Sequence, residues 1–127
     1  MKPRVIVADD NTDFLSVVVS TLQCTFDVVG TASDGHAAFH LICDSRPNVA
    51  ILDIAMPGLN GIQVTEKTKE RRIGTAVVIC SIETDPGLIQ AAREAGALAY
   101  VFKTRIKQDL VSAVRAAYQG HAFVSPL

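Results

Sequence analysis

Five polar residues of types that handle phosphate and metal ions follow short apolar runs in this sequence. Asp9 and Asp10 end the first run, and Asp53, Ser81 and Lys103 end three later ones. Each alone could be a cap or turn residue. Parallel strands, however, bring their carboxyl ends to one edge of a sheet, where such sheets place their sites. We therefore expect three carboxylates, one hydroxyl and one ammonium to converge there.

Three carboxylates brought together require a positive counter-charge. At an effective dielectric constant near 20, two unit charges about 4 Å apart interact by roughly 4 kcal/mol. At least one carboxyl pKa then rises unless a cation intervenes. Lys103 offers one charge, and Mg²⁺ offers two, prefers oxygen ligands and accepts phosphate oxygens. In such a site a carboxylate can act as the nucleophile and form an aspartyl phosphate.

Alternating patterns along the chain indicate the scaffold that positions these groups. Apolar runs at 5–8, 27–32, 49–52, 76–80 and 98–102 predict strands buried on both faces. Helical spacing lies between and after them, around 14–22 with Asn11 or Thr12 as the cap, 37–42, 61–72, 86–95 and 106–119. We therefore predict an α/β fold with five helices and a five-stranded parallel sheet. Numbered along the chain, the strand order is 2-1-3-4-5, doubly wound and flavodoxin-like.

Length and composition limit the functional classes. The chain has 127 residues, of which 49% are hydrophobic, and a formal net charge of −1. These values predict one folded domain and argue against nucleic-acid binding by overall electrostatics. No apolar run approaches the roughly 18 residues of a membrane span. The three cysteines lie far apart in the sequence, which favours a reducing cytoplasm over a disulfide scaffold.

The ordered set of motifs resembles the receiver domain of response regulators, the CheY-like fold. The motifs are the acidic pair at 9–10, DIAMPGLNG at 53–61, Ser81, and YVFK at 100–103. They match the family in order and spacing over essentially the whole chain. The resemblance implies a member of a two-component phosphorelay system that acts as a phosphoprotein in signal transduction. It also implies that the chain catalyses only its own phosphoryl transfer and dephosphorylation, and is not otherwise an enzyme.

Carried over by position, the resemblance implies a role for each motif residue. Asp53 is the expected phosphoacceptor, with a sensor histidine kinase as the partner that supplies the phosphoryl group. Ser81 and Lys103 are expected to hold the phosphoryl oxygens. Mg²⁺ is the expected cofactor, and its implied ligands are Asp10 and Asp53 directly, Asp9 through water, and the backbone carbonyl of Ala55.

The same resemblance implies a switch around Ser81 and Tyr100. Phosphorylation adds roughly −1.5 to −2 charges, and Ser81 and Lys103 gain partners only in that state. Such differential contact can bias a two-state element. Tyr100 resembles the family's aromatic switch, which moves inward as the hydroxyl of Ser81 shifts toward the phosphate. The responding surface would comprise the fourth helix, the fifth strand and the fifth helix. The ordinary alternative for Tyr100 is a half-buried core aromatic.

The end of the chain resembles a particular subfamily. Residues 113–126, AVRAAYQGHAFVSP, are similar to the receiver end and linker start of NarL/FixJ-type (LuxR-type) regulators, which carry a helix-turn-helix DNA-binding domain for transcription regulation. We expect a receiver at 1–119 and an interdomain linker beginning at 120–127, with the output domain outside this chain. A stand-alone receiver acting through protein–protein contacts is the alternative. We expect no direct nucleic-acid or membrane binding, and phosphorylation-dependent homodimerisation stays open.

Three residues depart from, or add to, the family pattern. Thr104 stands where the family often has a proline after a cis bond, which leaves the isomer of the Lys103–Thr104 bond open. Thr104 could instead cap the following helix. Ala55 carries no polar group to engage an attacking water. Glu83 could reach the phosphoryl group or point away, and we expect the lifetime of the phosphorylated state to depend on it.

Two other classes share the fold. A Mg²⁺-dependent phosphatase using Asp53 as nucleophile commonly has a second acid two residues on, where this chain has Ala55. A flavin or nucleotide binder needs a phosphate-binding loop after the first strand. Asp9 and Asp10 stand there instead and repel phosphate unless a metal intervenes. Turnover of a phosphomonoester would favour the first class, and a coloured, flavin-bearing preparation the second.

Overall fold

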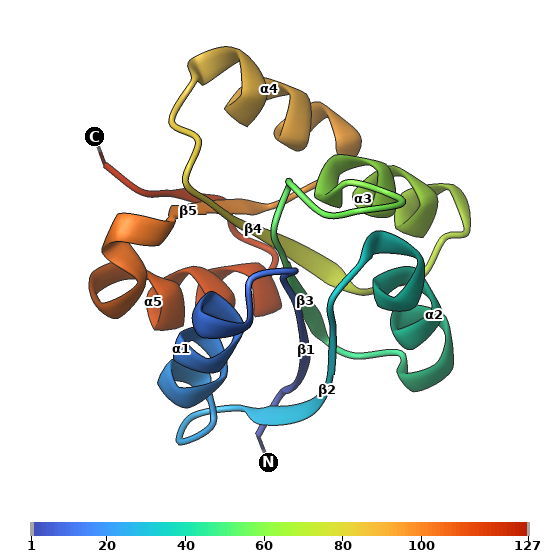
Figure 1. Ribbon diagram of the computed structural model, residues 1–127, viewed down its shortest axis with the longest axis horizontal. Helices are drawn as coiled ribbons and strands as arrows, with labels where there is room; N and C mark the ends of the chain where they lie inside the picture. Colours follow the sequence, from blue (N-terminus) through green and yellow to red (C-terminus); the bar gives the residue numbers. More distant parts are fainter. Residues whose placement is uncertain (1, 127) are drawn as a thin grey trace.

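A six-stranded parallel sheet lies between two layers of helices in the computed structural model, which describes residues 2–126 (Figure 1). In chain order the elements are β1 (Arg4–Ala8), α1 (Thr12–Leu22), β2 (Asp27–Ala32), α2 (Gly35–Ser45), β3 (Val49–Leu52), α3 (Gly61–Glu70), β4 (Ala76–Ser81), α4 (Pro86–Ala95), β5 (Ala99–Phe102), η1 (Lys103–Arg105), α5 (Ile106–Tyr118) and β6 (Phe123–Val124). The sheet order is β2-β1-β3-β4-β5-β6, and each neighbouring pair is parallel. The predicted order of the first five strands is therefore confirmed.

Two hydrophobic cores cover the two faces of the sheet. In β1, Ile6 contributes to the core that includes residues of α2, α3 and α4, and Val7 to the core with α1 and α5. Figure 1 shows the corresponding division of the helices. Successive side chains of a strand point to opposite faces, so a strand between two helical layers must be apolar throughout. This requirement explains the apolar runs of β1, β3, β4 and β5, which are largely buried. The expected burial of 27–32 on both faces is wrong, because β2 lies at the sheet edge and most of its residues are partly or fully exposed.

The predicted count of five strands is wrong, because residues 123–124 form a sixth strand against β5. The N–H of Phe123 donates to the carbonyl of Leu98 at 3.1 Å, and the N–H of Ser125 donates to that of Tyr100 at 2.9 Å. Without this strand, β5 would be a sheet edge with unpaired backbone groups. The part of the chain expected to begin a linker thus includes a strand of the sheet. The boundary at residue 119 stays a prediction.

Local signals set most of the helix ends. The side chain of Asn11 accepts the N–H groups of Asp13 and Phe14 at the start of α1. Pro86 occupies the first turn of α4, and Gly96 ends that helix with φ of +115°, a conformation that glycine adopts without steric cost. No helix in the described part of the chain is both long and apolar enough to cross a membrane.

The expected capping role of Thr104 is wrong. Thr104 lies inside the 3₁₀ turn η1, and α5 begins after Arg105 without a side-chain cap. Instead, the Arg105 guanidinium binds the Asp109 carboxylate one turn later, with Nε 2.7 Å from Oδ2. The 3₁₀ turn separates Thr104 from the first free N–H groups of the helix. The Lys103–Thr104 peptide bond is trans.

Candidate functional site

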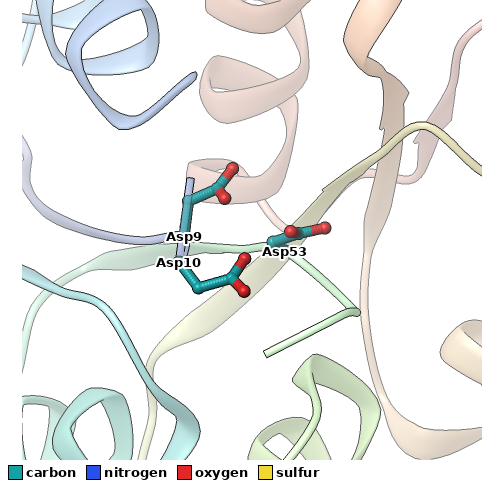
Figure 2. Close-up of side chains that lie close together, drawn as sticks. All are labelled: Asp9, Asp10 and Asp53. Atoms are coloured by element: carbon teal, nitrogen blue, oxygen red, sulfur yellow. The ribbon is translucent and has the colours of Figure 1, made fainter. Parts of the chain in front are cut away.

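The ammonium of Lys103 lies between two carboxylates at the carboxyl edge of the sheet. Its Nζ is 2.8 Å from Oδ2 of Asp9 and 3.2 Å from Oδ2 of Asp53. All three residues are buried, whereas Asp10 beside them is exposed. Figure 2 shows the side chains of Asp9, Asp10 and Asp53 beside one another. The predicted convergence of three acids and one lysine is therefore present.

Strand register places the two buried acids. Ala8 pairs with Leu52 at the ends of β1 and β3, so the next residue of each strand, Asp9 or Asp53, emerges at the same level. The N–H of Asp53 donates to the carbonyl of Ala8 at 3.0 Å and continues the ladder by one bond. Two residues far apart in sequence thus become neighbours.

Gly61 lets helix α3 begin directly against the backbone of Asp53. A Cβ at Gly61 would lie 2.2 Å from the carbonyl oxygen of Asp53, far inside any allowed contact. Asn60 and Gln63 form a capping box at this helix end, each side chain accepting the other residue's N–H. The Asn-Gly pair of the sequence motif therefore fixes the segment that follows Asp53.

The charges in this cluster oppose one another. One carboxylate oxygen from each of Asp9, Asp10 and Asp53 lies within 4.8 Å of the others. Burial raises the pKa of Asp53, the nearby Lys103 lowers it, the charge of Asp9 raises it, and the net direction is upward. Burial alone would lower the pKa of Lys103, but the hydrogen bond to Asp9 and the charge of Asp53 leave it raised. Lys103 therefore stays protonated, and negative charge remains in excess.

This donor set fits a small divalent cation. The three acids offer hard oxygen ligands at close range, which is the donor type that Mg²⁺ prefers. Lys103 compensates only one of the three negative charges. Ala55 lines the pocket beside Asp53, and the role of its backbone carbonyl stays a prediction. The residues present are thus suited to hold Mg²⁺.

A pocket of about 260 Å³ opens onto the cluster. Its lining comes from the ends of β1, β3, β4 and β5 and from the start of α1, and comprises Asp10, Asn11, Phe14, Asp53, Ile54, Ala55, Ser81, Ile82, Glu83 and Lys103. Glu83 is exposed, and Ile82 keeps 65% of its surface accessible. The pocket has the position expected for a site at the carboxyl ends of the strands.

Glu83 connects Ser81 to Tyr100 through its backbone. Its N–H donates to Oγ of Ser81 at 3.0 Å, and its carbonyl accepts the hydroxyl of Tyr100 at 2.9 Å. Tyr100 is 2% exposed, so it is fully rather than half-buried, and it already has the inward position that the resemblance assigns to the phosphorylated state. Its ring meets Phe102 edge to face at 5.9 Å between centroids. A shift of the Ser81 hydroxyl would therefore reach Tyr100 through a single intervening residue.

Two residues at the site were not predicted as functional. The Nζ atom of Lys103 lies 4.2 Å from the ring centroid of Phe14, and the backbone of Asn11 donates to the Asp9 carboxylate at 2.9 Å. Phe14 fits the helical apolar pattern, so its type indicated only core packing. Its place beside Lys103 depends on the neighbouring strands.

Sequence comparisons point to one family. Residues 5–115 match the family described as response regulator receiver domain. The chain is 35% identical, over 127 residues, to the "Probable transcriptional regulatory protein NarL" of Mycobacterium tuberculosis. It is 32% identical, over 126 residues, to the oxygen regulatory protein NreC of Staphylococcus epidermidis. These matches cover 98% and 95% of this chain but 59% and 57% of the relatives, so the chain spans about three fifths of their length.

Solved structures agree with the sequence matches. A DNA-binding response regulator of the LuxR family from Staphylococcus aureus superposes with a TM-score of 0.86 at 28% identity, covering 91% of this chain and 98% of that one. A two-component response regulator of the LuxR family from Aurantimonas sp. SI85-9A1 gives 0.93 at 25% identity, covering 99% and 91%. With the acidic cluster, the buried lysine and the parallel sheet already in place, these matches show that the chain belongs to the response regulator receiver domain family and that its relatives are regulators of the NarL and LuxR type.

Proposed function

We propose that this receiver accepts a phosphoryl group on Asp53 from a sensor histidine kinase, with Mg²⁺ as cofactor. The observation that carries the proposal is the Lys103 ammonium held 3.2 Å from Asp53 and 2.8 Å from Asp9 in a pocket open to solvent. Burying an ion pair next to an excess of negative charge costs folding free energy, so packing alone does not account for it. The same arrangement suits the transfer of an anionic group.

The chain's own residues supply the nucleophile and the positive charge. A carboxylate oxygen of Asp53 attacks the phosphorus of the phosphohistidine, and the new O–P bond forms as the P–N bond breaks. The histidine nitrogen leaves with the bonding electron pair and takes a proton from solvent. Lys103 turns from Asp53 to the phosphoryl oxygens. Held directly by Asp10, Asp53 and the Ala55 carbonyl and through water by Asp9, Mg²⁺ would neutralise charge on the transferred group.

The phosphorylated state would be transmitted through Ser81. Its hydroxyl leaves the N–H of Glu83 and donates to a phosphoryl oxygen. The Glu83 carbonyl holds the Tyr100 hydroxyl at 2.9 Å, so rearrangement of this backbone changes the support of Tyr100. The surface of α4, β5 and α5 then responds. This link supports the switch roles proposed for Ser81 and Tyr100, since a ligand shifts an equilibrium only through contacts that differ between states.

The similar proteins suggest what the receiver controls. A relative in the structure comparison is a DNA-binding response regulator, and the curated relatives are longer than this chain. We propose that the domain controls a C-terminal helix-turn-helix domain in transcription, with homodimerisation on phosphorylation. A stand-alone receiver that acts by protein–protein contact is the second candidate. The phosphatase alternative is weaker, because Ala55 provides no second acid. Catalysis is confined to the domain's own phosphorylation and dephosphorylation.

The test is Mg²⁺-dependent phosphorylation followed by intact mass. Wild type, Asp53→Ala and Asp27→Ala are incubated with a small phosphodonor, with Mg²⁺ or with a chelator. We expect one added phosphoryl group in wild type and in Asp27→Ala, whose exposed side chain lies on β2, only when Mg²⁺ is present. Asp53→Ala should gain none. Equal gain in Asp53→Ala, or gain without Mg²⁺, would refute the assignment.

Glu83 is proposed to set the lifetime of the phosphorylated state. Its exposed side chain lines the pocket mouth, while its backbone is tied to Ser81 and Tyr100. Glu83→Ala keeps the backbone contacts and removes only the carboxylate. A changed rate of phosphate loss from purified phosphoprotein supports the proposal, and an unchanged rate rejects it.

A further inference from the structure

The aromatic ring of Phe14 covers one side of the Lys103 ammonium. The distance of 4.2 Å from Nζ to the ring centroid lies well inside the roughly 6 Å range of cation–π attraction. We propose that Phe14 is a positioning residue that holds the Lys103 ammonium at the pocket wall and thereby accelerates phosphoryl transfer. This inference rests on the proposed phosphorylation of Asp53.

A chain of hydrogen bonds links the backbone of Phe14 to the carboxylate that binds Lys103. Lys103 binds Oδ2 of Asp9 at 2.8 Å, and Oδ1 of Asp9 accepts the N–H of Asn11 at 2.9 Å. The side-chain oxygen of Asn11 in turn accepts the N–H of Phe14 at 3.1 Å. The Phe14 ring contacts the ammonium of the same Lys103. The same turn that places a carboxylate on the ammonium thus places an aromatic face on it.

The ring contact persists when the carboxylate contact changes. During transfer an Asp53 oxygen forms a bond to phosphorus, so Asp53 ceases to be a free anionic partner for Lys103. Phe14 takes no part in bond making, and its attraction to the ammonium is maintained. The side chain of Lys103 is 5% exposed, and the half-buried ring lines the same pocket. Phe14 therefore restrains a flexible side chain at the moment it changes partners.

A matched control exists on another face of the molecule. Phe39 of α2 is also half-buried and also lies near cations, with Lys67 Nζ 5.8 Å and Arg71 Cζ 5.5 Å from its ring centroid. It does not line the pocket at Asp53. Phe39→Leu thus removes a similar ring and similar contacts without touching Lys103. Phe14→Tyr keeps the aromatic face and serves as the rescuing variant.

The first measurement reports on Lys103 without any phosphorylation. In protein labelled with ¹³C at lysine Cε, the Lys103 signal is assigned by its loss in Lys103→Arg. Protons above a ring face are shielded, so we expect an upfield Lys103 signal in wild type, Phe14→Tyr and Phe39→Leu. In Phe14→Leu it should move toward the position of exposed lysines. An unmoved Lys103 signal in a folded Phe14→Leu protein would overturn the inference.

The second measurement is the rate of phosphorylation by a small phosphodonor with saturating Mg²⁺. A partly desolvated cation–π contact corresponds to a rate effect of about fivefold. We expect phosphorylation of Phe14→Leu to be slower by that factor, with Phe14→Tyr and Phe39→Leu at the wild-type rate. An unchanged or faster rate in Phe14→Leu would overturn the positioning role. If wild type itself takes up no phosphate on Asp53, the proposed function fails instead, and the Lys103 signal still reports on the contact.

Discussion

Replacing Asp53 by Asn should stabilise the metal-free protein at neutral pH. The change removes a buried charge and keeps the side-chain shape and an oxygen that can accept from Lys103. At an effective dielectric constant of 20, two carboxylate oxygens no more than 4.8 Å apart repel by at least about 3.5 kcal/mol, and an ammonium at 3.2 Å attracts by about 5 kcal/mol. Asp53 faces two such carboxylates, Asp9 and Asp10, and one ammonium, so its net interaction is repulsive.

Screening reduces this net repulsion, because Asp10 is exposed. We expect the free energy of unfolding of Asp53→Asn to exceed that of wild type by about 1 kcal/mol. For a domain of this size, that gain corresponds to a rise in Tm of roughly 3–6 °C. The measurement is thermal unfolding at pH 7 in the presence of a chelator. Asp27→Asn, an exposed change on β2, is the control and should leave Tm unchanged.

The pH dependence of the stability difference between Asp53→Asn and wild type shows whether the charge of Asp53 is its cause. Burial raises the folded-state pKa of Asp53 above its ordinary value of 3.8. Between those two values the folded protein binds more protons than the unfolded chain, so wild-type stability falls as pH rises through that interval. The advantage of Asp53→Asn should therefore be absent below the ordinary value and complete above the folded-state pKa. A less stable variant at pH 7, or an advantage equal at all pH values, would refute this account of the cluster.

Three further outcomes follow from other contacts. Mg²⁺ at about one hundred times its Kd should raise wild-type stability by about 2.7 kcal/mol, and Asp10→Asn should weaken this effect in a metal titration followed by Tm. Gly61→Ala should lower the free energy of unfolding, measured in urea, by about 1–3 kcal/mol, because the added Cβ would lie 2.2 Å from the Asp53 carbonyl oxygen. Unchanged stability would contradict that close approach. Ser125→Ala should lower the free energy of unfolding by about 1–3 kcal/mol. It should also speed amide hydrogen exchange at Phe102, whose N–H donates to the Ser125 hydroxyl at 3.1 Å. Unaltered exchange would show that this bond does not hold β6.

Patterns local in sequence predicted the elements well for a physical reason. A strand buried on both faces must be apolar throughout, as in the run from Val49 to Leu52. Helix ends leave N–H and C=O groups that nearby residues must satisfy, and Asn11 and Gly96 do so at α1 and α4. Both requirements act over a few residues, so they are visible without knowing the fold. Two predictions made from local sequence were wrong. Thr104 does not cap α5, because it lies inside a 3₁₀ turn. The sheet has a sixth strand, because residues 123–124 pair with β5.

By itself, the sequence determined the chemical inventory of the site and the order of the elements that carry it. Residue types decide which groups can bear charge, and placing Asp53 directly after an apolar run brings it to a strand end. The tertiary structure alone decided the distances, and with them the partners of each group. Lys103 meets Asp9, Asp53 and the Phe14 ring only because strand register and helix packing bring together segments that are distant along the chain. The strength of a charge interaction depends on that separation and on burial, and neither quantity is local to any stretch of sequence.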